Sequence, residues 1–206
     1  EETGMLIPNR SYYEVYLKEN APIEGGVYSS GVNNVFEEIC RKTGITQILK
    51  RYFPEKYKEI LTVAQYMLSE GNVMSYIDDY TETHETAIKT KYDDVSSSRL
   101  FSSIREEDTI LFLKDWLKHN KTDEYIAYDV TSISSYSKQI AELEWGYNRD
   151  KERLPQINMG MYYGEESKLP LYYRIYPGSI SDKAHLKYMV NNSNTFKNNR
   201  LKYVVD

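Results

Sequence analysis

The hydrophobic positions of this chain follow two different periods, and the period changes near residues 120–123. Before that point, apolar residues recur at the three- and four-residue spacing of amphipathic helices. After it, they alternate with polar residues, as in half-buried strands. The pattern predicts a mixed α+β or α/β protein, with a mostly helical amino-terminal domain over residues 1–122 and a sheet-containing domain over residues 123–206.

Four helices are expected in the first part, separated by glycine or proline. The first follows Ser30 and ends at Gly44, a residue type that often terminates helices. A serine and a glutamate three residues apart, Ser103 and Glu106, predict a capping box before the last helix. Residues 78–98 are polar, and no element is assigned to them. The apolar face of the first helix consists of Val32, Val35, Phe36, Ile39 and Cys40, and the other helices cover residues 45–52, 57–68 and 110–117.

Four strands are expected in the second part, at residues 124–131, 156–163, 171–176 and 200–205. Between the last two strands, Ser181 caps a helix that begins at Asp182, whose charge suits the first turn. The first three strands predict an antiparallel meander. The fourth, reached across a helix, predicts a parallel neighbour of the first.

Two aspartates occupy related positions in this arrangement. Asp129 lies in the first strand and Asp206 directly follows the fourth, so parallel pairing would bring them to the same edge of the sheet. Adjacent carboxylates repel unless a cation lies between them or one of them is protonated. Oxygen ligands suit Mg²⁺ or Mn²⁺, and two such ions about 3.5–4 Å apart support in-line phosphoryl transfer. The alternative is that Asp129 is an ordinary strand residue and Asp206 a turn residue.

Charge and cysteine content narrow the class of protein. The formal net charge is -5 and the isoelectric point is about 5.4, which argues against a polybasic nucleic-acid binder. The acidity lies in residues 1–122, whereas residues 123–206 are neutral. A single cysteine, Cys40, excludes an internal disulfide framework and a cysteine-based zinc finger, and it fits a reducing compartment such as the cytoplasm. No apolar run is long enough for a transmembrane helix or a signal peptide, so no membrane partner is expected.

Four segments of the second part resemble, in order, segments of bacterial insertion-sequence transposases of the DDE type. The strand Tyr128-Asp-Val-Thr-Ser132 resembles the one that carries the first catalytic aspartate of that family. The segment from Gly146 to Gly160 resembles the pattern Gly-x-Ser-Lys-Asp-x-Arg-x-x-Pro-Gln and the strand after it. The segment from Leu169 to Asp182 resembles Gly-x-Pro-x-x-Tyr-x-x-x-Pro-Gly-Asn-x-x-Asp, and Tyr203-Val-Val-Asp206 resembles the strand of the second aspartate.

The resemblance implies that residues 123–206 are the first half of an RNase H-like catalytic core, ordered strand-strand-strand-helix-strand. Asp129 and Asp206 would be catalytic ligands of Mg²⁺ or Mn²⁺, and the partner would be double-stranded DNA at transposon ends and targets. Asn148-Arg149 and Ser179 depart mildly from the family patterns. The family's catalytic glutamate is not in this sequence, so the resemblance implies a fragment with two of three catalytic carboxylates, inactive alone.

Several other residues have both a functional and a structural interpretation. Arg149, Lys151 and Arg153 either contact DNA phosphates or belong to a solvated loop. Gln156 either bonds DNA or starts a strand, and Trp145 either stacks on a base or packs at a domain interface. The three histidines are expected at the surface, and an incomplete sheet with an open edge predicts a homodimer or poor solubility. The alternative function is that of a non-catalytic interaction protein, a decayed or domesticated transposase remnant.

Overall fold

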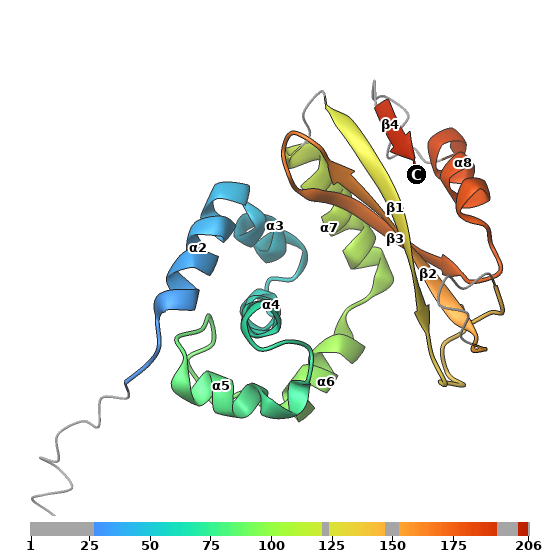
Figure 1. Ribbon diagram of the computed structural model, residues 1–206. Helices are drawn as coiled ribbons and strands as arrows, with labels where there is room; N and C mark the ends of the chain where they lie inside the picture. The colour runs from blue at the N-terminus through green and yellow to red at the C-terminus, as the bar shows by residue number, and fades with distance from the viewer. Residues whose placement is uncertain (1–26, 121–123, 147–152, 193–201, 206) are drawn as a thin grey trace, which may run out of the picture.

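The computed structural model describes residues 27–120, 124–146, 153–192 and 202–205 (Figure 1). A helical part, residues 27–120, precedes a sheet part, residues 124–205, and the whole is a mixed α+β structure. The helical part contains α2 (Gly31–Thr43), α3 (Ile45–Tyr52), α4 (Tyr57–Ser69), η2 (Met74–Tyr76), α5 (Ile77–Thr83), α6 (Asp94–Ser103) and α7 (Glu106–His119). The sheet part contains β1 (Tyr125–Ser134), β2 (Gln156–Gly164), β3 (Pro170–Pro177), α8 (Asp182–Asn192) and β4 (Lys202–Val205).

The predicted break between the first two helices is confirmed at Gly44. This residue has φ 72°, a left-handed conformation that ends α2 and starts α3, and glycine adopts it without steric cost. A Cβ atom here would also lie 2.6 Å from Nε2 of His119, at the end of α7. Gly44 therefore ends a helix and lets α7 approach the α2–α3 junction closely.

Residues 78–98, to which no element was assigned from the sequence, contain most of α5 and the start of α6. Asp93 caps α6, its Oδ1 accepting a 2.8 Å hydrogen bond from the backbone N–H of Ser96. The predicted capping box at Ser103 and Glu106 is wrong, because Ser103 is the last residue of α6 and its hydroxyl donates to the carbonyl of Leu100. Helix α7 starts after Arg105 without a side-chain cap.

The sheet has the strand order β3-β2-β1-β4. Strands β1, β2 and β3 form an antiparallel meander, and β4 pairs with β1 in parallel, with α8 in the connection. Both predictions about strand direction are thus confirmed. The register of β1 and β4 runs from Tyr125 opposite Lys202 to Tyr128 opposite Val205.

Helices pack beside the sheet in two places (Figure 1). Helix α8 contributes Met189 and Leu186 to a core that includes Tyr128 and Tyr162. Helix α7 contributes Leu113 and Leu117 to the same core, and the Trp116 indole N–H donates a 2.7 Å hydrogen bond to the carbonyl of Pro170 in β3.

Trp116 is buried, and Phe112, one helical turn before it, packs against both the sheet core and the core of the helical part. The Phe112 ring lies 6.1 Å from that of Phe53, which follows α3. Helix α7, which precedes the predicted domain boundary, therefore contacts both parts of the chain.

Candidate functional site

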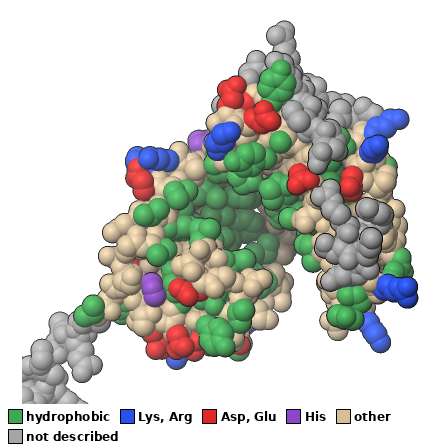
Figure 2. Space-filling view, viewed as in Figure 1, with side chains coloured by type: hydrophobic (Ala, Val, Ile, Leu, Met, Phe, Trp, Pro, Cys, Tyr) green, Lys and Arg blue, Asp and Glu red, His purple; other side chains and the backbone are tan. Residues whose placement is uncertain are grey.

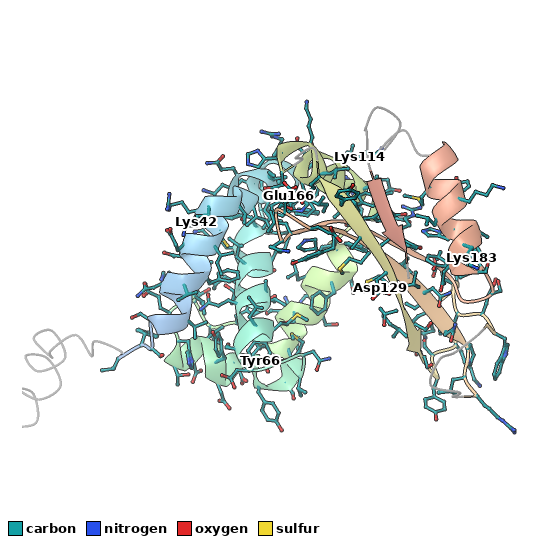
Figure 3. All side chains as sticks on the ribbon, turned by 45° about the horizontal axis from the view of Figure 1, so that its top comes forward. Lys42, Tyr66, Lys114, Asp129, Glu166 and Lys183 are labelled. Carbon is teal, nitrogen blue, oxygen red and sulfur yellow. The ribbon has the colours of Figure 1, made fainter. Side chains whose placement is uncertain are left out.

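Asp129 lies on the face of the sheet opposite α8. Its neighbour Tyr128 points the other way, where its ring packs 4.9 Å from that of Tyr162 in the core shared with α8. Because side chains alternate along a strand, Asp129 is on the face turned away from α8, as Figure 3 shows. The carboxylate is exposed, and its Oδ1 accepts a 2.9 Å hydrogen bond from the N–H of Val130. An exposed carboxylate on a rigid central strand is suited to bind a cation from solvent.

The second predicted carboxylate, Asp206, lies outside the described residues. In the parallel register, Val205 lies opposite Tyr128. In the sequence, Asp206 follows Val205 and Asp129 follows Tyr128. The strand arrangement on which the pairing of the two aspartates depends is confirmed. Their proximity stays a prediction.

Within the described ranges, no group of three or more histidine, cysteine or acidic side chains is arranged to hold a metal ion. Asp129 fits Mg²⁺ or Mn²⁺ as one hard oxygen ligand, and further ligands would have to come from Asp206, from water or from DNA. Metal binding stays a prediction.

The face of the sheet that α8 covers holds a partly buried polar cluster. The Tyr176 hydroxyl donates a 2.9 Å hydrogen bond to Oδ1 of Asp182, and the Tyr176 ring stacks on His185 at 3.8 Å. Asp182 thus starts α8, as predicted, and also anchors it to β3. Burial raises the pKa of Tyr176, a shift reinforced by the nearby Tyr128 hydroxyl and by the hydrogen bond to Asp182.

The prediction of a surface position is wrong for His185, which is only 6% exposed. Burial lowers its pKa to about 4, with the nearby Arg174 lowering it further and Asp182 acting in the opposite direction. The available signal was helical spacing, because His185 precedes the buried Met189 by four residues and therefore shares its face.

Gln156 is a junction between three segments of the chain. It pairs with Ser134 of β1 and exchanges two backbone hydrogen bonds, of 3.1 and 2.9 Å, with Glu144. Its side chain is 0% exposed and its Nε2 donates to Oδ1 of Asn158. Gln156 therefore starts β2 and holds the loop at Glu144. This position matches the structural alternative given for Gln156 above, that of a residue that starts a strand.

Two glycines of the resemblance segments meet at this junction. A Cβ atom on Gly146 would overlap the carbonyl oxygen of Gly178, and a Cβ on Gly178 would overlap the carbonyl of Gln156. The hydroxyl of Ser179 also donates to the carboxylate of Glu144. The segments around residues 146, 156 and 178 are therefore packed backbone to backbone, which sequence spacing alone did not indicate.

An exposed surface of aromatic and cationic side chains lies around this junction. Trp145 is 67% exposed and Tyr136 is 84% exposed, and Lys138 and Arg153 are also exposed. These four residues are called the hairpin-end surface below. They belong together because Ser135 donates to the carbonyl of Pro155 and Glu144 is bonded to Gln156.

In Figure 2, cationic and hydrophobic side chains gather at the lower end of the sheet part. Sequence reasoning selected Trp145 and Arg153 from this surface but missed Tyr136 and Lys138. Arg149 and Lys151 lie outside the described residues.

Comparison with family models, curated proteins and solved structures gave no match. In the part of the chain that the structure describes, no helix is both long and apolar enough to cross a membrane.

Proposed function

We propose that this chain is part of a DDE-type transposase with an RNase H-like core, in which Asp129 and Asp206 bind Mg²⁺ or Mn²⁺ for cleavage and strand transfer of transposon DNA. The observation that carries the proposal is the parallel pairing of β4 with β1 across α8. The strand order β3-β2-β1-β4 agrees with the first half of the core that the sequence segments imply. An exposed aspartate in the central strand supports the same interpretation.

Asp129 would position a metal ion at the reacting phosphate. The metal would supply charge stabilisation and an activated hydroxyl group, which is the chemistry a divalent ion offers in phosphoryl transfer. The hydrogen bond from the N–H of Val130 restrains Oδ1 of this carboxylate. Without the family's glutamate, these residues alone are expected to bind metal weakly and to cleave DNA poorly.

In the proposed function, the hairpin-end surface would contact DNA. Lys138 and Arg153 can position phosphates, and Trp145 and Tyr136 can stack on bases where the duplex is opened. Both halves of the chain lack a net positive charge, so binding is expected to be weak and strongly salt-dependent.

Metal-dependent stabilisation tests the proposal. With a dissociation constant of about 1 mM, 10 mM Mn²⁺ would stabilise the fold by about 1.4 kcal/mol and raise the melting temperature by about 3–5 °C. Asp129→Asn and Asp206→Asn should each abolish the shift. Asp79→Asn, which changes an exposed aspartate on α5, is the matched control and should keep it. An equal shift in all three variants would contradict the proposal.

A non-catalytic interaction protein is the second candidate, and one feature of α2 favours it. Val32, Val35 and Ile39 form an exposed apolar ridge on this helix, with Val35 63% exposed. Exposed apolar ridges at helical spacing are a common way to dock another helix. No metal-dependent stabilisation, together with loss of partner binding in Val35→Asp, would favour this candidate.

A further inference from the structure

The helical part contains a cavity of about 480 Å³ between α2, α3, α4 and residues 86–89. That volume falls within the range of small-molecule sites. All its lining residues belong to the helical part, so it is separate from Asp129 and from the hairpin-end surface. Figure 3 shows the two longest walls, α2 and α4, side by side, with Lys42 and Tyr66 labelled on them.

The orientation of α2 around this cavity is unusual. The helix leaves the Val32-Val35-Ile39 ridge in solvent and turns Asn33 inward, where it is only 4% exposed. The Asn33 amide makes no hydrogen bond with another described side chain or backbone group, although it lines the cavity. Because Asn33 lines the cavity, its amide is placed to form hydrogen bonds with a molecule that enters it.

The cavity floor is polar and fixed. Gln65, 1% exposed, donates through Nε2 to the carbonyl of Glu85 at 2.8 Å and to the hydroxyl of Tyr80 at 3.3 Å. This orientation leaves the Gln65 carbonyl oxygen as an acceptor. The neighbouring Thr86 donates its hydroxyl to the carbonyl of Ile88. The side-chain carbonyl oxygen of Gln65 and the amide of Asn33 together offer acceptors and a donor, which can recognise a polar ring.

The rim of the cavity is cationic, although the surrounding half of the chain is acidic. Four of its side chains are positively charged and one, Glu37, is negatively charged. Arg41 is paired with Glu38 and Lys89 with Glu85. Lys50 and Lys58 form no ion pair with any described residue, and Lys50 lies 5.0 Å from the centre of the Tyr57 ring. These two lysines are therefore available to an anion.

We propose that this cavity binds a small phosphate-bearing compound with a planar, hydrogen-bonding ring, of the class of the nucleoside monophosphates. The side chains of Phe36 and Leu61 provide apolar walls for a ring. The Asn33 amide can pair with a ring edge through its donor and its acceptor, as asparagine does with adenine. Lys50 and Lys58 are placed at the mouth to hold the phosphate as point charges.

Isothermal titration of the chain tests the proposal with the four nucleoside 5′-monophosphates, the matching uncharged nucleosides and inorganic phosphate. At least one monophosphate should bind with a dissociation constant below about 1 mM, at least about tenfold tighter than its nucleoside and than phosphate alone. Lys50→Ala and Lys58→Ala should each weaken it about fivefold or more and leave nucleoside binding unchanged. Lys114→Ala, an exposed lysine on α7, is the matched control and should have no effect.

Asn33→Leu separates a ligand role from a structural one. If Asn33 is retained for a ligand, leucine should leave the melting temperature equal or higher while monophosphate binding is lost. The proposal is overturned if no monophosphate binds below 10 mM, a concentration about tenfold above the expected constant. It is also overturned if Lys58→Ala binds as the Lys114→Ala control does. Neither outcome bears on the metal site at Asp129, which the Mn²⁺ experiment tests separately.

Discussion

Tyr128 in β1 lies opposite Val205 in β4, in a parallel register that starts at Tyr125 and Lys202. This pairing connects two strands that are far apart in the sequence, and Tyr128 and Val205 are each followed by an aspartate. Parallel strands present corresponding positions to the same edge of a sheet. The relationship between Tyr128 and Val205 is therefore the structural basis for proposing that Asp129 and Asp206 act together.

Gly146→Ala and Gly178→Ala should strongly destabilise the protein. In each case the added methyl group would overlap a backbone carbonyl, which cannot move without separating the junction at Gln156. We expect a loss of about 2 kcal/mol or more in the free energy of unfolding, measured by urea denaturation.

Gly31→Ala is the matched control for these two variants, because a Cβ at Gly31 meets nothing within 4 Å and the residue is helical. It should stabilise the protein by about 0.5–1 kcal/mol. Similar effects of all three substitutions would show that the junction is not closely packed.

Glu124 should be important for the turn between β2 and β3. Its buried carboxylate accepts hydrogen bonds of 2.6 and 2.8 Å from the backbone N–H groups of Glu166 and Ser167. Glu124→Ala leaves those donors without this acceptor and should cost about 1–3 kcal/mol in chemical denaturation. Glu166→Ala keeps the backbone donor and removes only an exposed side chain, so its cost should stay below about 0.5 kcal/mol.

Low pH should destabilise the packing of α8 on the sheet, because His185 becomes protonated there. Its pKa is about 4 in the folded protein against 6.5 when unperturbed, so the unfolded chain binds more protons between these values. The stabilisation is complete above pH 6.5 and is lost as pH falls toward 4.

Between pH 7.5 and pH 5, His185 should account for a loss of about 1–2 kcal/mol in the free energy of unfolding. His185→Phe keeps an aromatic ring beside Tyr176 and should remove that part of the pH dependence. An unchanged pH dependence in this variant would show that protonation of His185 is not coupled to unfolding.

Trp145→Ala and Arg153→Ala should weaken DNA binding in different ways. Loss of Trp145 should reduce affinity for DNA with unpaired bases by about 1–3 kcal/mol and spare duplex DNA. Loss of Arg153 should weaken both and reduce the slope of log affinity against log salt by about one. Fluorescence anisotropy with labelled oligonucleotides measures these effects, and Tyr76→Ala, an exposed aromatic residue of η2, is the control. Equal affinities in all variants would place any DNA contact elsewhere.

Local signals made the regular elements predictable from sequence. Gly44 ends the first helix at the expected place, and alternation located the strands, including the parallel β4. Helix α6 was missed because it is short and rich in serine, with few apolar residues to reveal its period. The capping box failed because Ser103 and Glu106 have the right spacing but belong to two consecutive helices.

Tertiary contacts were harder to predict from the sequence than the helices and strands. Periodicity identified the apolar face of α2 but gave no sign that Val35 would remain exposed while Asn33 turned inward. The burial of His185 depends on Tyr176, which lies in a different element. The junction of Gly146 with Gly178 depends on backbone proximity, which a one-dimensional pattern does not contain. For the candidate site, the sequence predicted the arrangement of the strands but not the face of the sheet on which Asp129 lies.

Paramagnetic broadening by Mn²⁺ in an NMR spectrum of the amide-labelled chain tests the metal site most directly. At substoichiometric Mn²⁺, the account predicts selective loss of the amide signals of residues 128–131 and 203–206, with those of the helical part retained. Asp129→Asn should restore the signals, and Asp79→Asn should not. Broadening that is uniform, or that centres on the acidic helices and persists in Asp129→Asn, would contradict a metal site between β1 and β4.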